Sequence, residues 1–141
     1  MRYKIPIEII ELEKDNYHLV VNSVFVNGEM GYWVIDTGAS KSIFDKNLAD
    51  FYSIIEGRTE NLHSAGISEE PLKSEVATMK PFSFAGMKIE NMQLAVLDLT
   101  HINELYSAST DMEICGLLGG DFLVRHKAVI DYKKKLLILR K

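Results

Sequence analysis

The 141-residue sequence predicts one closed, mainly β domain with one or two short helices. Apolar residues alternate with polar ones at a period of two along most of the chain, which is the pattern of strands with one face exposed to solvent. The apolar runs are short and are separated by turn-forming residues. No internal repeat or linker interrupts them, so we expect residues 1–141 to form a single domain.

The first third of the chain predicts a strand and a hairpin. Apolar and polar residues alternate over residues 5–9, which indicates a strand. Residues 17–26 are rich in Val, Phe and Tyr, and residues 32–35 form a second apolar run. Asn27–Gly28 stands between these runs, and such a pair favours a tight β-hairpin. The hairpin ends at Asp36.

The rest of the chain predicts short helices among further strands. Residues 44–52 place apolar side chains on one helical face, with Asp45 as the N-cap. Residues 57–75 are polar and predict a long exposed excursion. Short helices are also expected near residues 102–107 and 119–125. Strands are expected at 75–79, 81–84, 87–89, 93–99, 127–131 and 135–139.

Composition excludes several classes of partner. A net charge of −4 and a pI near 5.6 lack the basic excess of a nucleic-acid-binding protein. The basic run at residues 133–135, with Arg140 and Lys141 nearby, is interpreted as a solvated turn between strands, with a binding patch as the alternative. No stretch approaches the length of a membrane span and no signal-peptide core follows Met1. We therefore expect a cytoplasmic protein without a nucleic-acid or membrane partner.

Cysteine and histidine usage predicts neither a disulfide nor a metal site. The one cysteine, Cys115, lies in an apolar stretch and is expected to be buried and unreactive. The four histidines, at positions 18, 63, 101 and 126, show no metal-ligand spacing. We expect no metal and no cofactor.

The residues at the end of the hairpin carry the first chemical signal. Asp36 follows an apolar strand and precedes Thr37, Gly38 and Ala39. The strand would hold the carboxylate in a fixed place, and Gly38 permits a tight turn that brings backbone N–H groups close to it. The Thr37 hydroxyl can bond another backbone or a matching loop. Asp-Thr-Gly by itself also suits an ordinary turn.

A second segment strengthens the signal. Leu117, Leu118 and Gly119 come about 80 residues later, followed by the short helix expected over 119–125 and the strand that ends at Asp131. In order and spacing, residues 17–139 resemble the retropepsin-like aspartic proteases, which include retroviral proteases and bacterial single-domain relatives. The resemblance implies a closed acid-protease β barrel and hydrolysis of peptide bonds.

The same resemblance implies a mechanism that needs two carboxylates. Two aspartates hold a water between them, and one stays protonated because adjacent like charges do not both ionise easily. This chain has only one Asp-Thr-Gly; Asp98, Asp121 and Asp131 are not followed by Ser or Thr and then Gly. The site therefore requires Asp36 from each of two copies, related by a two-fold axis. The expected homodimer forms through the Asp-Thr-Gly loops and the termini, with Thr37 locking the loops together.

The resemblance also implies a flap that closes over a peptide or protein substrate. We place it at residues 61–68, with His63, Ser64, Ala65, Gly66 and Ile67 as its substrate-binding part. His63 is the one histidine expected near substrate. Pepsin-type sites carry a hydroxyl three residues after the aspartate, where this chain has Ala39. One hydrogen bond fewer to the carboxylate predicts a less acidic optimum than that of pepsin-type enzymes.

Two alternatives remain open from the sequence. The chain is an active homodimeric endopeptidase, or it is a catalytically silent retropepsin-fold module that binds peptides or dimerises without cutting. The intact Asp-Thr-Gly favours the enzyme. An unrelated β domain with a chance Asp-Thr-Gly turn leaves the later Leu-Leu-Gly segment unexplained.

Overall fold

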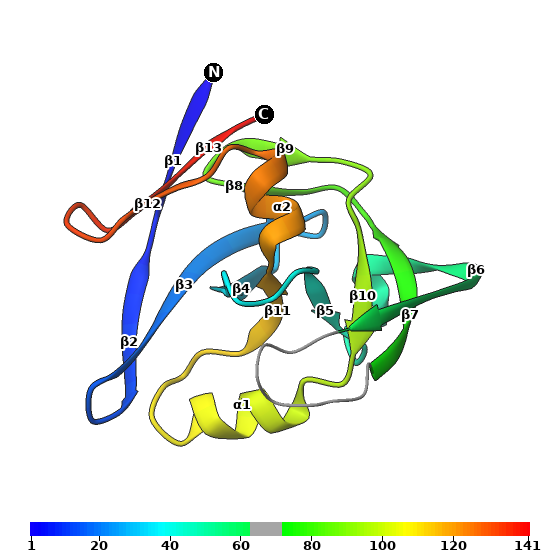
Figure 1. Ribbon diagram of the computed structural model, residues 1–141, viewed down its shortest axis with the longest axis horizontal. Helices are drawn as coiled ribbons and strands as arrows, with labels where there is room; N and C mark the ends of the chain where they lie inside the picture. The colour runs from blue at the N-terminus through cyan, green and yellow to red at the C-terminus, as the bar shows by residue number, and fades with distance from the viewer. Residues whose placement is uncertain (63–71) are drawn as a thin grey trace.

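The structure is a computed structural model that describes residues 1–62 and 72–141. It is built mainly from strands (Figure 1). The strands are β1 (Arg2–Pro6), β2 (Glu8–Glu13), β3 (Asn16–Phe25), β4 (Met30–Ile35), β5 (Ile43–Asp45), β6 (Tyr52–Leu62), β7 (Leu72–Met79), β8 (Phe82–Phe84), β9 (Met87–Ile89), β10 (Gln93–Leu97), β11 (Ile114–Leu118), β12 (Val129–Asp131) and β13 (Leu136–Arg140). The helices are α1 (Thr100–Ser107), α2 (Gly120–Arg125) and a 3₁₀ turn, η1 (Ala49–Phe51).

The strands form two sheets. The larger has the order β6-β7-β10-β5-β11-β4-β3-β8-β9, with β2 paired to β3, and the smaller has the order β1-β13-β12. The large sheet curls around the core as a half-barrel with free edges, so the closed barrel expected from the sequence is not confirmed (Figure 1). The smaller sheet brings both termini to one end of the molecule.

The centre of the large sheet positions two loops at one edge. β11 lies between β4 and β5, parallel to β4 and antiparallel to β5. In this register Leu117 lies opposite Val34 and Leu118 opposite Ile35. Because parallel strands end at the same edge, the loop that begins with Asp36 meets the segment that begins with Gly119.

An aromatic core fixes the strand that leads to Asp36. Trp33 is fully buried, stacks on Phe82 and contacts Phe44. Its indole N–H donates a 2.9 Å hydrogen bond to Oγ of Ser23, whose hydroxyl donates in turn to the Gly31 carbonyl oxygen. A large buried ring with its polar atom satisfied has little freedom to move. β4 therefore offers a rigid support for the residue that follows it.

Two expectations about the middle of the chain are wrong. Residues 44–52 do not form an α-helix, because Phe44 is buried in β5 opposite Gly116 and only Ala49–Phe51 turn as a 3₁₀ helix. Asp45 is no N-cap; its carboxylate accepts hydrogen bonds from the backbone N–H groups of Asn47 and Leu99. Of the exposed excursion expected over 57–75, residues 57–62 and 72–75 belong to the paired strands β6 and β7, and residues 63–71 lie outside the described residues.

Expectations about the first hairpin, the two short helices and the burial of Cys115 are confirmed. The Asn27–Gly28 hairpin joins β3 to β4, and α1 and α2 lie where short helices were expected. Cys115 is buried, and burial raises the pKa of its thiol well above the ordinary value. Within residues 1–62 and 72–141, no helix is long and apolar enough to cross a membrane.

Candidate active site

Asp36 is held at the end of β4 by backbone hydrogen bonds. Its N–H donates to the Leu118 carbonyl oxygen at 2.9 Å, and the N–H of Ala39 donates to the Asp36 carbonyl oxygen at 3.2 Å. The Gly38 N–H donates to Oδ1 of the Asp36 carboxylate at 3.1 Å. The carboxyl-bearing residue is half-buried, whereas Thr37 and Gly38 are exposed. A backbone donor and partial access to solvent give a carboxylate that is positioned yet able to exchange protons with a ligand.

Residues 119–121, which follow β11, hold this loop in place through hydrogen bonds and a close backbone contact. We call these contacts the brace. The Gly120 N–H donates to the Ala39 carbonyl oxygen at 2.7 Å. Gly119 lies so close to the loop that a Cβ built on it would be 2.7 Å from the carbonyl carbon and oxygen of Lys41 and 2.8 Å from the Ala39 carbonyl oxygen. Only glycine fits there, which gives a physical reason for the glycine of the Leu-Leu-Gly segment.

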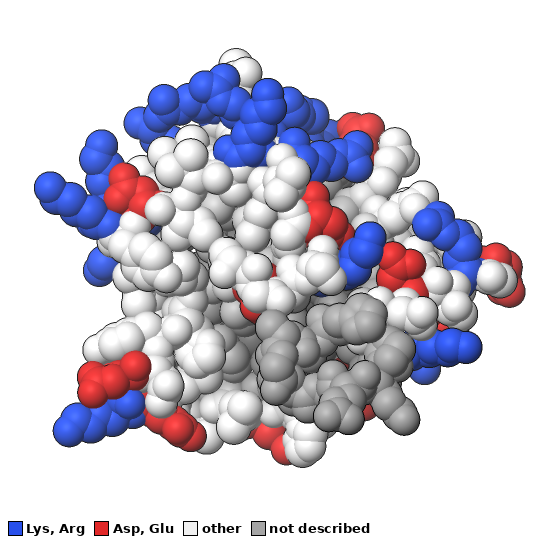
Figure 2. Space-filling model, in the orientation of Figure 1, with Lys and Arg blue, Asp and Glu red and all other residues white. Residues whose placement is uncertain are grey.

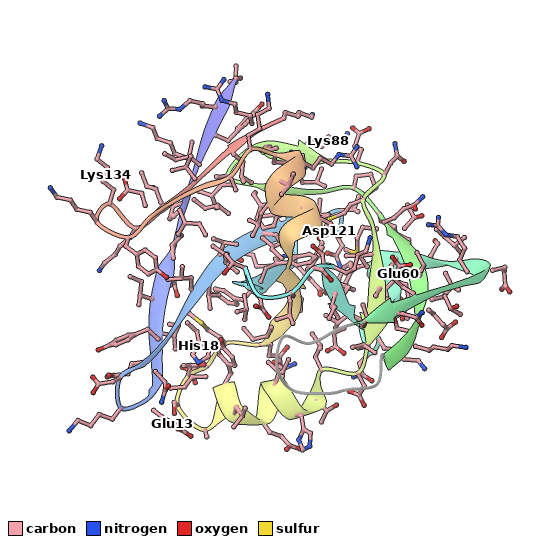
Figure 3. The ribbon with its side chains drawn as sticks, viewed as in Figure 1. Glu13, His18, Glu60, Lys88, Asp121 and Lys134 are labelled. Carbon is pink, nitrogen blue, oxygen red and sulfur yellow. The ribbon has the colours of Figure 1, made fainter. Side chains whose placement is uncertain are left out.

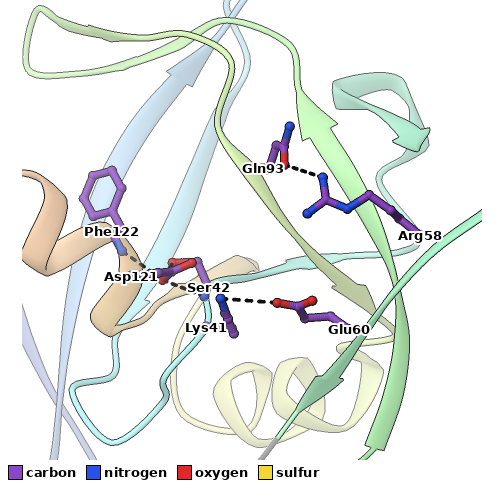
Figure 4. Close-up of polar contacts among 7 residues, drawn as sticks. All are labelled: Lys41, Ser42, Arg58, Glu60, Gln93, Asp121 and Phe122. Carbon is purple, nitrogen blue, oxygen red and sulfur yellow. Dashed lines mark hydrogen bonds and ion pairs between the residues drawn. The ribbon is translucent and has the colours of Figure 1, made fainter. Parts of the chain in front are cut away.

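A buried serine and an aspartate complete the brace (Figure 4). Oδ1 of Asp121 accepts hydrogen bonds from the N–H and the hydroxyl of Ser42, at 2.9 and 2.8 Å, and from the N–H of Phe122 at 2.8 Å. Oγ of Ser42, which is fully buried, accepts a 2.9 Å bond from the Gly119 N–H. The network connects residues 79 positions apart. No local sequence pattern indicates such a contact. The sequence analysis therefore did not predict the roles of Ser42 and Asp121.

An ion pair also connects the loop to β6. Nζ of Lys41 lies 3.2 Å from Oε1 of Glu60, and Arg58 donates to the side-chain oxygen of Gln93 in β10 at 2.8 Å (Figure 4). Both Lys41 and Glu60 are partly exposed, so their attraction contributes at most about 1 kcal/mol. The pair nevertheless links the Asp36 loop to the strand that ends at Leu62.

A cleft of about 510 Å³ opens beside Asp36. Val34 and Leu117, which face each other across β4 and β11, contribute to its wall. The β2–β3 hairpin and α1 supply the other sides, through Leu12, Glu13, Asn16, His18, Ile102, Leu105, Tyr106, Ala108 and Ser109. A concave, mostly apolar space that is also lined by the acidic residues Asp36 and Glu13 is suited to a side chain of a bound polypeptide.

The two helices therefore have different roles. α1 forms part of the cleft, which its sequence did not reveal, and α2 carries the brace at its first turn. His18 also lies in the cleft, its ring 6.0 Å from that of Tyr106, although only His63 was expected near substrate. Glu13 in β2 and His18 in β3 both belong to the hairpin and line the cleft that it forms with α1 (Figure 3). Tyr106 is buried, and burial raises the pKa of its hydroxyl to about 12.

The remaining predicted residues divide into three groups. Leu117 lines the cleft, whereas Leu118 is fully buried and Gly119 belongs to the brace. Thr37, Gly38 and Ala39 follow Asp36 in the loop, and the Gly38 N–H donates to its carboxylate. The predicted flap residues, His63, Ser64, Ala65, Gly66 and Ile67, lie outside the described residues.

The other candidate aspartates have structural hydrogen-bonding partners. Hydrogen bonds from Thr100 and Asn47 lower the pKa of Asp98, and Asp131 accepts the N–H of Lys134 at 2.9 Å. Asp121 belongs to the brace. No cluster of His, Cys, Asp and Glu in the described part of the chain has the arrangement of a metal site. A second cleft of about 360 Å³, lined by Lys88, Arg125, His126 and Lys141 among others, does not include Asp36.

Comparison with known proteins identifies a family and similar folds. The family model described as Aspartyl protease matches residues 22–122. The fold is similar to the crystal structure of a retropepsin-like aspartic protease from Rickettsia conorii, with a TM-score of 0.53, 23% identity, and 99% of this chain and 89% of that chain covered. It is also similar to the retroviral protease-like domain of Ddi1 from Leishmania major, with a TM-score of 0.51, 20% identity, and 85% and 89% covered. Comparison with curated protein sequences finds no significant match.

Proposed function

This chain belongs to the aspartyl protease family and is retropepsin-like, and we propose that two copies of it form an aspartic endopeptidase. The observation that carries the proposal is the Asp36 loop. Its carboxylate accepts the Gly38 N–H and borders the cleft. The rest of the loop is hydrogen-bonded to residues 119–121 through Ala39, Ser40 and Ser42. The described part of one chain holds one Asp-Thr-Gly aspartate, so the second carboxylate comes from a second copy.

In the proposed dimer the two Asp36 carboxyl groups share one proton and hold a water between them. The ionised carboxylate removes a proton from the water as the water oxygen attacks the peptide carbonyl carbon. The protonated carboxyl group hydrogen-bonds the oxygen on which negative charge develops. When the tetrahedral intermediate collapses, the C–N bond breaks and the leaving nitrogen takes a proton, so that a carboxylic acid and an amine result.

The support for a two-fold contact lies in what the single chain leaves exposed. Thr37 and Gly38 face solvent at the tip of the loop, where the hydroxyl of Thr37 can reach the loop of a second copy. We include the terminal sheet in the proposed contact, because it lies at one end of the molecule with β1 and β12 as its free edges. The full chain, residues 1–141, acts as one domain in this proposal.

Peptide cleavage tests the proposal. A diverse peptide mixture is incubated with concentrated protein between about pH 3.5 and 7, a range that spans the titration of carboxyl groups. Cuts are expected with the unmutated protein and not with Asp36→Asn. Cleavage that survives Asp36→Asn would show that the wrong carboxylate has been assigned. No cleavage by a sample shown to be dimeric would favour the silent peptide-binding module instead.

A further inference from the structure

The cleft beside Asp36 has an uneven distribution of polarity. Its walls are largely apolar, with Leu12 on the hairpin and Leu105 on α1 among them. Glu13, at the end of β2, also lines it, and its side chain is exposed. Among the described residues, the Glu13 carboxylate takes part in no ion pair and accepts no hydrogen bond. The cleft therefore combines an apolar surface with a carboxylate available to a ligand.

The charged side chains of the cleft have one sign. Of the described residues that line it, Glu13 and Asp36 are the acidic ones, and none is Lys or Arg. A ligand charge entering the cleft thus meets negative charge near Asp36 and again at Glu13. A cation gains from both, whereas an anion is repelled by both.

The net charge of the protein is also unevenly distributed along the chain. Residues 1–4 and 125–141 carry nine Lys and Arg residues and one Asp, a net +8, so the remaining residues carry −12. Figure 2 shows many Lys and Arg side chains at the end that holds both termini, and fewer elsewhere on this face. The hairpin end of the cleft lies away from this basic surface (Figure 3). On the β2–β3 hairpin the one cationic side chain is Lys14, which follows Glu13 in the sequence and does not line the cleft.

From these observations we propose that the cleft binds a Lys or Arg side chain of the substrate, next to the bond that is cut; this rests on the endopeptidase function proposed above. The methylene stem lies along Leu12 and Leu105, and the ammonium or guanidinium group reaches Glu13. Long cationic side chains are amphipathic and pack their stems on apolar surface while their charged ends stay near water or a carboxylate. The substrate class is therefore a cationic polypeptide segment.

Three peptides that differ at one residue beside the cut bond test the assignment. The variable residue is Lys, norleucine, which keeps the stem without the charge, or Glu. The peptides are compared at about pH 6, within the range used for the cleavage assay. We expect kcat/KM to fall about fivefold from Lys to norleucine, the size of a partly exposed ion pair, and to fall further for Glu.

Two variants with the same change in charge test whether the preference for Lys depends on Glu13. Glu13→Lys should reverse the preference, so that the Glu peptide is cut faster than the Lys peptide. Glu8→Lys makes the same change in charge on the same strand, but Glu8 is exposed and does not line the cleft, so it should leave the ratios as they are. A Lys-to-norleucine ratio of one or less, or a ratio that Glu13→Lys leaves unchanged, would overturn the assignment.

Binding separates this inference from the catalytic proposal. Fluorescently labelled forms of the three peptides are titrated with the Asp36→Asn protein, and also with the unmutated protein if it proves silent. The same order, Lys above norleucine above Glu, is expected for the affinities. If nothing is cut but this order appears, the endopeptidase proposal fails and the cationic site stands; if cutting occurs without the order, only the cationic site fails.

Discussion

Replacing Gly119 with alanine probes the contact that holds the Asp36 loop in place. A Cβ at this position would lie 2.7 Å from the Lys41 carbonyl carbon and oxygen, about 0.7 Å inside the 3.4 Å at which ordinary contact begins. The atoms it meets belong to the backbone, so no side chain can rotate away to relieve the overlap. The loop itself has to move.

The overlap translates into expected losses of stability and activity. Overpacking of a tight site costs about 1–3 kcal/mol, and we expect the free energy of unfolding of Gly119→Ala to fall by about 2 kcal/mol. A displacement of the loop approaching 1 Å should also lower kcat/KM by roughly 10²-fold, because the reacting groups lose their alignment. Urea unfolding followed by the fluorescence of the single, buried Trp33 measures the first quantity, and peptide cleavage measures the second.

The neighbouring glycine provides a matched control. A Cβ on Gly120 would lie 3.6 Å from the Ala39 carbonyl oxygen, an ordinary contact. Gly120 is also the first residue of α2, where alanine is favoured over glycine by up to about 1 kcal/mol. Gly120→Ala should therefore be neutral or slightly stabilising. If the two variants unfold at the same urea concentration and cleave equally well, the close approach of Gly119 to the loop does not restrict this position to glycine.

Three further predictions concern stability and reactivity. Asp121→Ala leaves the N–H and hydroxyl of buried Ser42 without their acceptor, so the free energy of unfolding in urea should fall by about 2–4 kcal/mol. The control Asp131→Ala removes one exposed hydrogen bond and should lower it by less than about 1 kcal/mol. Equal losses would contradict the structural role of Asp121. Cys115, whose thiol pKa is raised by burial, should react with a thiol reagent only after denaturation, and rapid reaction of the native protein would contradict its burial. Burial lowers the pKa of His126 below its ordinary 6.5, and Arg125 makes a smaller contribution in the same direction. As the pH falls, the unfolded state therefore takes up a proton before the folded state does. The free energy of unfolding should decrease as the pH falls below about 6.5. His126→Gln should flatten that dependence in urea unfolding at successive pH values, and an unchanged slope would contradict it.

The sequence predicts best what is determined locally. The alternation over residues 5–9, which falls on the end of β1 and the start of β2 rather than on one strand, involves residues two apart, and the Asn27–Gly28 turn involves adjacent ones. The position of Asp36 after an apolar strand is a local feature of the same kind. Such patterns remain visible in a single sequence because the side chains that determine them are neighbours along the chain.

The sequence predicts poorly what distant contacts determine. Phe44, Leu48 and Phe51 have the spacing of a helical face, yet Phe44 is buried in a strand because it lies opposite Gly116 in β11. Tertiary packing overrides local propensity at such positions. Asp121 shows the same limit in the site, since its partner Ser42 is 79 residues away and nothing near either residue indicates the other.

The distribution of charge bears on how two copies would meet. β1 is already paired with β13 of its own chain, so the terminal sheet offers only the edges of β1 and β12 to a partner. These edges belong to the part of the molecule with a net charge of +8, and a two-fold contact between them would bring like charges together. Salt at about 0.1 M screens such repulsion beyond roughly 10 Å, against roughly 30 Å at 0.01 M. The attraction in the proposed dimer therefore has to come from the Asp36 loops and from backbone pairing at the free edges rather than from charge.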